Sequence, residues 1–355
     1  MPDVSSGSSP TSGEAAPSSS AQDPAPERPS VRIVVTGSIA TDHLMHFPGR
    51  FTDSLLPDQL HRVSLSFLVD DLQVRRGGVA ANICFTMGVL GQRPVLLDAV
   101  GSDFGPYDVW LSDHGVDTEH VLRCDDVATA RFVCTTDDEL NQIGSFYAGA
   151  MSRARDIELV PVLDELGDVD LVMISAGDPD AMTRHAAECR QHGYPFAADP
   201  SQQLARIDGA QARELVGGAE LLFSNDYELG LLKSKTGWSD EQILVRVGHR
   251  ITTHGAKGVE ITSAAGESLT VKALPERTKT DPTGVGDGFR GGFLAGRSVG
   301  LPMRRCAELG SLMATLVLET VGTQEYAFDR TDAQQRLADC YGVDSATEIG
   351  TALGW

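Results

Sequence analysis

The sequence predicts an α/β protein with a doubly wound, mainly parallel central sheet flanked by helices, and with a small β-sheet lid. Short apolar runs recur along the chain, as expected for strands buried on both faces of a parallel sheet. Helix-like stretches separate several of these runs, and this alternation indicates βαβ units. The predicted strands are 31–37, 94–100, 170–176, 196–199, 220–225 and 250–255, and the predicted helices between them include 79–90, 104–114, 178–192 and 227–236.

Two stretches interrupt the alternation and predict the lid. Residues 61–76 and 128–147 have the pattern of short strands separated by turns. We expect the lid to be inserted in the main domain at about 44–76 and 126–150. There it would cover the ends of the strands, where ligands of such folds bind.

The main domain is predicted to span residues 31–345, followed by a C-terminal tail at 346–355. From Asp287 onward its sequence has helical periodicity almost throughout. Residues 1–30 are dominated by Ser, Pro and Ala, and they contain too few large apolar side chains to offset the entropy cost of folding. We expect a disordered leader there. A transit peptide is the alternative, but one arginine among several acids is the wrong balance for it.

Composition and charge exclude several classes of function. The formal net charge is −21 at pH 7, which opposes non-specific binding to a nucleic-acid backbone. The six cysteines contain no C-x-x-C pair, so neither a zinc site nor a disulfide framework is predicted. No apolar run is long enough to cross a bilayer, and the N-terminus lacks a secretory signal. We therefore expect a cytoplasmic protein that binds neither nucleic acid nor membrane.

The strongest chemical signal is the stretch TDPTGVGDGFRGGF, residues 280–293. Two glycines can turn backbone amides toward one point, and the dipole of the following helix adds roughly half a positive charge. This pattern predicts an anion hole at Gly284, Val285 and Gly286. A Walker loop is absent, as is a dinucleotide G-x-G-x-x-G loop after the first strand, so neither common nucleotide motif explains it. A glycine-rich helix entrance capped by Asp287 is the structural alternative.

Polar residues and glycines also close other apolar runs. In open α/β sheets the ligand lies at the carboxyl ends of the strands, so these residues are expected to converge. Asn225 and Glu228 have a spacing that suits a hydrated magnesium ion. The positions concerned are Ser38 and Asp42 in GSIATD, Gly78 and Asn82 in RRGGVAAN, Asn225 and Glu228 in NDYE, and Thr253, Gly255 and Gly258 in TTHGAKG.

On these motifs, the chain resembles the ribokinase, or PfkB, family of carbohydrate and nucleoside kinases. The segments DPTGVGDGF and GGVAAN match the two signatures of the family, and the resemblance covers about residues 31–345. Within the family, TGSIATDHLMHFPGRF, VSLSFLVDDLQVRRGGVAAN, ADPSQQLAR and DPTGVGDGFRGGFLAGRS resemble the adenosine kinases of mycobacteria and their actinobacterial relatives. The resemblance implies a ribokinase-like fold. It also implies transfer of the γ-phosphate of MgATP to the 5′-hydroxyl of adenosine, giving AMP and ADP, a purine-salvage reaction.

The resemblance assigns roles to individual residues. Asp287 would be the catalytic base that takes the proton of the 5′-hydroxyl, and Glu228 would bind Mg²⁺ through water. Gly284, Val285 and Gly286 would hold the transferring phosphoryl group. The other positions are implied to bind adenosine (Ser38, Asp42 on the 2′ and 3′ hydroxyls, Ser66, Gly78, Asn82, Phe132, Phe146, Gln202 and Gln203) or ATP (Asn225, Thr253, Gly255, Gly258 and Gly286).

Further expectations concern charge and helix stability at this stretch. Because a helix N-terminus lowers the pKa of a carboxylate, Asp287 would stay ionised and weakly basic. Gly288 and Gly291 stand where many relatives have alanine, which should loosen the start of the helix by up to about 1 kcal/mol each. His254 replaces an apolar residue in the ATP turn. We assign it no catalytic role, because Asp287 already fills the role of base.

Two other functions share most of these residues. A sugar kinase of the same family, a ribokinase or fructokinase, would keep the phosphate side, and a catalytically silent nucleoside sensor would keep the acceptor side. The paired rings of Phe132 and Phe146 favour a purine, although they would equally suit a small core within the lid. Exposed edges of the lid sheet favour a homodimer. The acceptor range, the phosphate donor and activation by K⁺ are left open.

Overall fold

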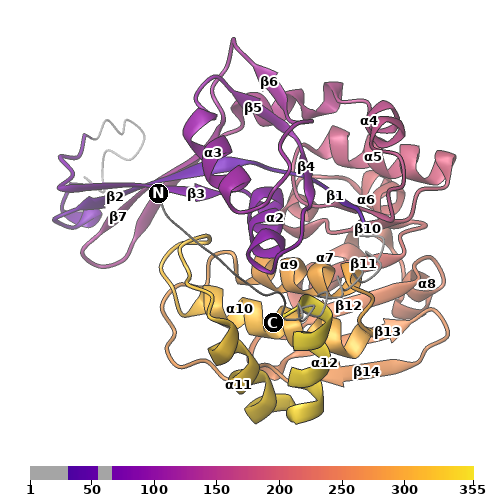
Figure 1. Cartoon of the computed structure of the whole chain (residues 1–355). Helices are drawn as coiled ribbons and strands as arrows, with labels where there is room; N and C mark the ends of the chain where they lie inside the picture. Colours follow the sequence, from indigo (N-terminus) through magenta and orange to yellow (C-terminus); the bar gives the residue numbers. More distant parts are fainter. Residues whose placement is uncertain (1–30, 55–65) are drawn as a thin grey trace, which may run out of the picture. The chain divides into compact units, whose positions relative to one another are not determined.

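The central sheet has eight strands in the order β14-β13-β12-β11-β10-β9-β1-β4 (Figure 1). The computed structural model describes residues 31–54 and 66–355, so the predicted leader and residues 61–65 of the first lid stretch lie outside it. Its strands β4, β1, β9, β10, β11 and β12 pair in parallel, and β13 and β14 add an antiparallel edge. The predicted α/β class with a mainly parallel sheet is therefore confirmed.

The bounds of the elements are as follows. The strands of the described residues are β1 (Ile33–Thr36), β2 (Ala40–Phe47), β3 (Asp71–Gly77), β4 (Val95–Leu97), β5 (Ala99–Gly101), β6 (Leu122–Cys124), β7 (Ala130–Asp137), β8 (Gln142–Tyr147), β9 (Leu171–Ile174), β10 (Phe196–Ala198), β11 (Leu221–Asn225), β12 (His249–Thr253), β13 (Val259–Ser263) and β14 (Ser268–Val271). The α-helices are α1 (Phe51–Ser54), α2 (Val79–Val89), α3 (Gly105–Asp113), α4 (Leu159–Leu166), α5 (Pro179–His192), α6 (Gly209–Val216), α7 (Asp226–Thr236), α8 (Asp240–Leu244), α9 (Val285–Ser298), α10 (Met303–Leu318), α11 (Arg330–Tyr341) and α12 (Val343–Leu353). The 3-10 helices are η2 (Gly149–Asp156), η3 (Ser201–Ala205) and η4 (Gly255–Lys257).

Helices cover both faces of the sheet, which makes the fold doubly wound as predicted. Side chains of a strand alternate between its two faces. Ile33 and Val35 accordingly enter a core shared with α2, α9 and α10, whereas Val34 enters a second core shared with α5 and α6. Among the described residues, none of the helices combines the length and the apolar character needed to cross a bilayer.

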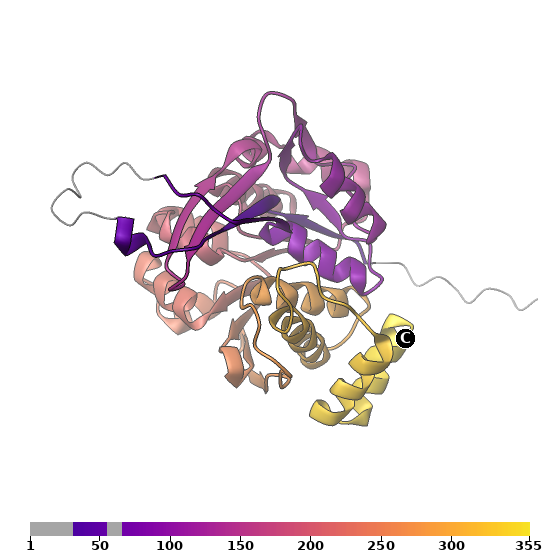
Figure 2. The same ribbon diagram turned by 90° about the vertical axis from the view of Figure 1, so that its left-hand side faces the viewer.

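The lid is a separate four-stranded sheet in the order β3-β2-β7-β8. Its strands β2, β3 and β7 extend from one side of the body in Figure 1, and Figure 2 views the molecule from that side. The lid begins at Ala40, earlier than the predicted residue 44, because the chain leaves β1 and enters β2 after three residues. The sequence had placed Asp42 at the end of the first strand. In the structure it lies within the lid strand β2.

Two predicted boundaries differ from the observed elements. The apolar run 94–100 divides at the buried Asp98 into β4 and β5, and β5 leaves the central sheet to pair with β6. Helix α12 continues through residue 345, and its Ile349 is fully buried in the core. The segment expected to be a tail therefore forms a helix that packs on the core of the main domain.

The glycines of α9 allow close packing of helices. A Cβ atom on Gly288 would lie 2.8 Å from Val317 Cγ2, and one on Gly291 would lie 2.5 Å from Thr86 Cβ and 2.8 Å from the carbonyl oxygen of Ile83. The sequence predicted only that glycine loosens the start of this helix, and the structure adds that packing requires glycine at both positions. Intrinsic propensity favours alanine, but α2 and α10 leave no room for a methyl group.

We expect Gly291→Ala to lower the free energy of unfolding by about 1–3 kcal/mol, the usual cost of overpacking. Gly230→Ala is the matched control. Gly230 is an exposed residue of α7 with open space around it, so alanine there should stabilise the protein by up to about 1 kcal/mol. Urea unfolding followed by circular dichroism measures both changes. A Gly291→Ala protein as stable as the wild type would contradict the packing account.

Candidate active site

The predicted anion hole lies at the entrance of α9. Gly284 is the N-cap of this helix and has a left-handed φ of 73°, a conformation that favours glycine. A Cβ atom there would also lie 2.6 Å from Thr323 Cγ2. The amides of Val285 and Gly286 follow in the first turn, where a helix leaves its N–H groups without intrahelical partners. The local geometry suits an anion, and binding of the phosphoryl group here stays a prediction.

Asp287 is held in the same helical turn by one specific side chain. Asn82, in the first turn of α2, donates a 2.8 Å hydrogen bond from Nδ2 to Asp287 Oδ2. Asn82 Oδ1 in turn accepts from Thr323 Oγ1 and from Gln324 Nε2, each at 2.9 Å. These acceptor contacts fix the orientation of the amide, so Asn82 positions the candidate base. Its predicted contact with ribose stays a prediction.

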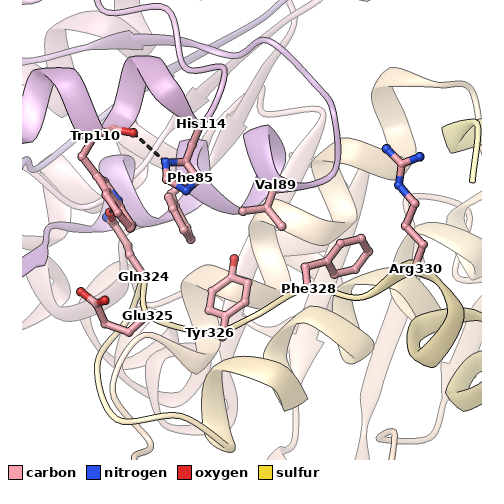
Figure 3. A pocket seen from close by; sticks show the side chains of 9 residues that line it. All are labelled: Phe85, Val89, Trp110, His114, Gln324, Glu325, Tyr326, Phe328 and Arg330. Atoms are coloured by element: carbon pink, nitrogen blue, oxygen red, sulfur yellow. Dashed lines mark hydrogen bonds between the residues drawn. The ribbon is translucent and has the colours of Figure 1, made fainter.

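Gln324 connects this network to a group of aromatic side chains, the aromatic wall, which includes Phe85, Trp110 and Tyr326 (Figure 3). Its Oε1 accepts from Trp110 Nε1 at 3.1 Å, and its Nε2 donates to Tyr107 Oη at 2.6 Å. The guanidinium of Arg76 lies 4.0 Å from the centre of the Trp110 ring. A hollow of about 430 Å³ borders this wall, between Trp110, Tyr326 and their neighbours. It contains none of the predicted site residues, and the wall serves to hold Gln324 behind the base.

The electrostatics of Asp287 differ from the expectation. Burial raises the pKa of its carboxyl to about 6, and Glu228 adds to the rise, while the hydrogen bond from Asn82 and the charge of Arg290 oppose it. The predicted lowering by the helix dipole is therefore wrong, because loss of water around the carboxylate outweighs the dipole. Burial likewise raises the pKa of Asp42 to about 6, with Asp281 as the next cause. Asp287 is a stronger base than a solvated aspartate.

A pH dependence follows from these values. The ionised carboxylate is the form that can accept a proton, so we expect turnover at saturating substrates to fall as pH drops through about 6. A rate profile from pH 5 to 9 measures this, with circular dichroism at each pH to confirm folding. Asp42 has a similar pKa, and the profile will therefore report both groups together. Turnover that stays constant down to pH 4.5 would contradict the assignment of the base.

The lid register gathers three of the predicted acceptor residues. Asp42 of β2 is opposite Phe132 of β7, and Phe132 is opposite Phe146 of β8. Residues directly opposite one another share a face, so all three lie on the same face of the lid. Phe146 is 49% exposed, which is more than a ring within a lid core would be. Ser66 is exposed in the loop before β3, and its role stays a prediction.

The remaining predicted acceptor residues lie around the ends of β1 and β10. Ser38 Oγ accepts from the amide of Val79 at 3.0 Å, and Gly78 has a φ of 96° with no space for a Cβ atom beside Ser38. Gln202 is exposed in η3. Gln203 is 5% exposed and donates from Nε2 to the carbonyl of Gly177 at 2.7 Å. Its Oε1 has no hydrogen-bond partner within the described residues.

The predicted ATP residues meet at the ends of β11 and β12. Asn225 and Thr253 are register partners on these adjacent parallel strands. Asn225 Oδ1 accepts from the amide of Glu228, and Glu228 Oε2 accepts from the amide of Asn225, both at 2.8 Å, so this pair forms the N-terminal cap of α7. Gly255 and Gly258 follow with φ of 56° and 98°. The turn requires glycine at Gly258, because a Cβ atom there would lie 2.1 Å from the carbonyl oxygen of Val271.

The carboxylates present fit a magnesium ion that arrives with the nucleotide. In the part of the chain that the structure describes, no cluster of three or more His, Cys, Asp or Glu side chains could hold a metal by itself. Mg²⁺ keeps several waters and binds through one or two carboxylates plus phosphates. Glu228 fits this donor set, because its Oε1 makes only a 3.4 Å contact with Ser201 Oγ.

Two functional candidates escaped the sequence analysis. Arg290, one turn after Asp287, forms a buried ion pair with Asp199 at the end of β10. Both residues lie in segments that carry the family resemblance, but no local pattern pairs two residues that are 91 positions apart. Gln324 was also missed, and its 242-residue separation from Asn82 left no local signal.

Comparisons with known proteins identify the family of the chain. A family model described as pfkB family carbohydrate kinase matches residues 36–329. The chain belongs to the pfkB family of carbohydrate kinases. The family predicted from the two signatures is thus confirmed.

Several relatives within the pfkB family cover nearly all of the folded chain. A "Nucleoside kinase" of Methanothermobacter thermautotrophicus is 29% identical over 316 residues, which are 88% of this chain and 97% of that protein. The ligand-free nucleoside kinase of Burkholderia thailandensis is 36% identical with a TM-score of 0.76, covering 86% of this chain and 99% of that one. Its complex with inosine is 34% identical, with a TM-score of 0.75 and coverage of 87% and 98%. The narrower assignment to actinobacterial adenosine kinases stays a proposal, because these relatives are nucleoside kinases without that restriction in their names.

Proposed function

We propose that this pfkB-family protein is a nucleoside kinase that transfers the γ-phosphoryl group of MgATP to the 5′-hydroxyl of adenosine, giving AMP and ADP. One observation carries the proposal: Asp287, held by Asn82, lies in the first turn of a helix whose entrance is built as an anion hole. A proton acceptor and a phosphoryl site are thereby fixed within one turn. The nucleoside kinases among the relatives support a nucleoside as the acceptor.

The geometry suggests how the residues of this chain would act. Asp287 would accept the proton of the 5′-hydroxyl as its oxygen forms a bond to the γ-phosphorus. The bond from that phosphorus to the bridging oxygen breaks, and its electron pair leaves with ADP. The amides of Gly284, Val285 and Gly286 would hold the phosphoryl oxygens during this transfer. Bound Mg²⁺, near Glu228, would neutralise charge on the phosphates.

Adenosine is favoured over a free sugar by the acceptor side of the site. Phe132 and Phe146 share a lid face with Asp42, so two rings and a carboxylate suit a base and a ribose diol together. A sugar kinase would have no use for these rings, and a silent sensor no use for Asp287.

An acceptor panel tests the proposal. Release of ADP is measured with adenosine, inosine, guanosine, ribose, fructose and no acceptor, in buffers containing either K⁺ or Na⁺. We expect the highest kcat/KM with adenosine. Preference for ribose or fructose would establish the sugar kinase instead, and nucleoside binding without ADP release would establish a sensor.

We also propose that two copies associate through the lid. The face of the lid opposite Asp42 exposes Leu72 and Val74, each 58% exposed, together with Ile143 and Tyr147, which are 47% and 48% exposed. Leu72 and Val74 lie on the edge strand β3, and Ile143 and Tyr147 lie on the opposite edge strand β8. Exposed apolar side chains of this kind favour association.

Leu72→Asp is expected to convert the dimer into a monomer. Placing a charge in an apolar interface costs several kcal/mol, enough to dissociate it at micromolar concentration. Val109→Asp is the control, because Val109 is 62% exposed on α3, outside the lid. Equilibrium sedimentation measures the mass of each. A wild-type protein that is only monomeric at micromolar concentration would overturn this proposal.

A further inference from the structure

A buried arginine lies beside the candidate base. Arg290 follows Asp287 by three residues in α9, and it is only 5% exposed. Its Nη2 donates to Asp199 Oδ1 at 2.6 Å, and its Nε lies 2.6 Å from Asp199 Oδ2, an ion pair with poorer hydrogen-bond alignment. Asp199 is fully buried. The guanidinium is thus held from one side by a carboxylate at the end of β10.

The pair lies in an unusually acidic environment for a phosphate site. Besides Asp199, Glu228 Oε2 lies 3.9 Å from Arg290 Nη2, and Asp287 interacts electrostatically with the same guanidinium. Three carboxylates therefore surround one arginine. A triphosphate entering between them would meet repulsion from each, and Arg290 supplies the fixed positive charge close to the base.

One nitrogen of the guanidinium lies beside Gly286, the last residue of the predicted anion hole. A Cβ atom on Gly286 would lie 2.7 Å from Arg290 Nη1. Because the Cα–Cβ bond of a helical residue leans toward the N-terminus, Nη1 lies on the side of Gly286 nearer the helix entrance. No described residue accepts a hydrogen bond from Nη1, whereas Nη2 and Nε are engaged by Asp199. The absence of a side chain at Gly286 leaves the space that Nη1 occupies.

We propose that Arg290 is a further catalytic residue, whose Nη1 donates to a nonbridging oxygen of the transferring phosphoryl group while Asp199 holds the guanidinium in place. The proposal rests on the proposed function in taking ATP as the donor. A planar guanidinium presents donors in two directions, so one side can bind Asp199 and the other the phosphoryl group. A lysine ammonium paired with Asp199 does not reach both.

The test compares ligands with and without the γ-phosphate. Affinities for ADP and for the nonhydrolysable β,γ-imido analogue of ATP are measured by calorimetry with Mg²⁺, and kcat is measured with adenosine. For Arg290→Lys we expect analogue affinity to fall about 10- to 100-fold, ADP affinity to stay within about twofold, and kcat to fall at least as much as the analogue affinity, as for loss of a charge-assisted hydrogen bond.

Matched variants separate this role from a structural one. Arg297→Lys alters another ion-paired arginine of α9, bound to Glu220 at 2.7 Å, and should change none of the three quantities. If Arg290→Lys fails to fold, Arg290→Met combined with Asp199→Leu replaces the pair by apolar side chains of similar volume, and the same selective loss is expected. Equal losses for ADP and the analogue, or unchanged kcat and analogue affinity, would overturn the proposal.

The outcome is distinguishable from failure of the proposed function. The calorimetry needs no acceptor. If the wild type does not phosphorylate adenosine but Arg290→Lys still weakens only the analogue, the acceptor assignment fails and the role of Arg290 is supported. If adenosine is phosphorylated and both variants match the wild type, only the role of Arg290 fails.

Discussion

Asp287→Asn is expected to reduce turnover of adenosine by a factor of about 10²–10⁴ while leaving adenosine affinity nearly unchanged. The amide has the size of the carboxylate, and its oxygen can still accept the 2.8 Å hydrogen bond from Asn82, so the site keeps its shape. It cannot take a proton at neutral pH. Steady-state release of ADP and calorimetric binding of adenosine measure the two effects. Asp344→Asn, in the first turn of α12, is the control and should leave both unchanged.

The same variant provides an internal check on folding. The folded protein raises the pKa of Asp287 above that of a solvated aspartate, so the charged carboxylate destabilises the fold above about pH 6 and costs nothing below about pH 4. Asp287→Asn should therefore be more heat-stable than the wild type at pH 8, with the difference vanishing at low pH. Substantial remaining turnover, or a variant less stable at pH 8, would contradict the role assigned to Asp287.

Asp42→Asn is expected to lower kcat/KM for adenosine by about 10²–10³, the loss of two hydrogen bonds between a carboxylate and the ribose hydroxyls. Asp42 stands opposite Arg75 and Phe132 in the lid, on the face that carries the rings. If the carboxylate binds the diol, the variant should lose much less with 2′-deoxyadenosine than with adenosine, because one partner is already missing. Kinetics with both nucleosides measure this coupling.

Asp71→Asn is the matched control for Asp42. Asp71 is an exposed acid of the lid strand β3 whose side chain accepts a hydrogen bond from Gln73. Its substitution should leave kcat/KM unchanged for both nucleosides. An Asp42→Asn protein that loses adenosine and 2′-deoxyadenosine activity equally would show that Asp42 organises the lid and does not contact the diol.

The buried carboxylates at and near this site lower the stability of the fold, and neighbouring side chains offset that effect. Asp287, Asp199 and Asp98 are carboxylates whose burial raises their pKa values, which opposes folding at neutral pH. Arg290 compensates Asp199, and Asn82 with Gln324 compensates Asp287. Hydrophobic packing on both faces of the sheet offsets the remaining free-energy cost of burying these carboxylates. Stability is thus concentrated away from the site, as expected where function requires buried charge.

The sequence by itself determined the architecture and the local parts of the site. The strands β1, β9, β10, β11 and β12 and the helices α2, α3, α5 and α7 followed from apolar runs and helical periodicity, because those patterns report burial along one element. The glycine-rich entrance of α9 was also predictable. Gly284, Gly286 and Asp287 are close in sequence, and the turn, the helix entrance and the acid are properties of that one segment.

Only the tertiary structure decided what depends on distant segments meeting. Asn82 and Gln324, and Arg290 and Asp199, are far apart in sequence, so no periodicity could pair them. The register of the lid placed Asp42 beside Phe132, and close packing of α9 against α2 made Gly291 indispensable where helix propensity favoured alanine. The pKa of Asp287 was predicted in the wrong direction for the same reason. The helix dipole is visible in the sequence, whereas desolvation is set by every element that folds around the carboxylate.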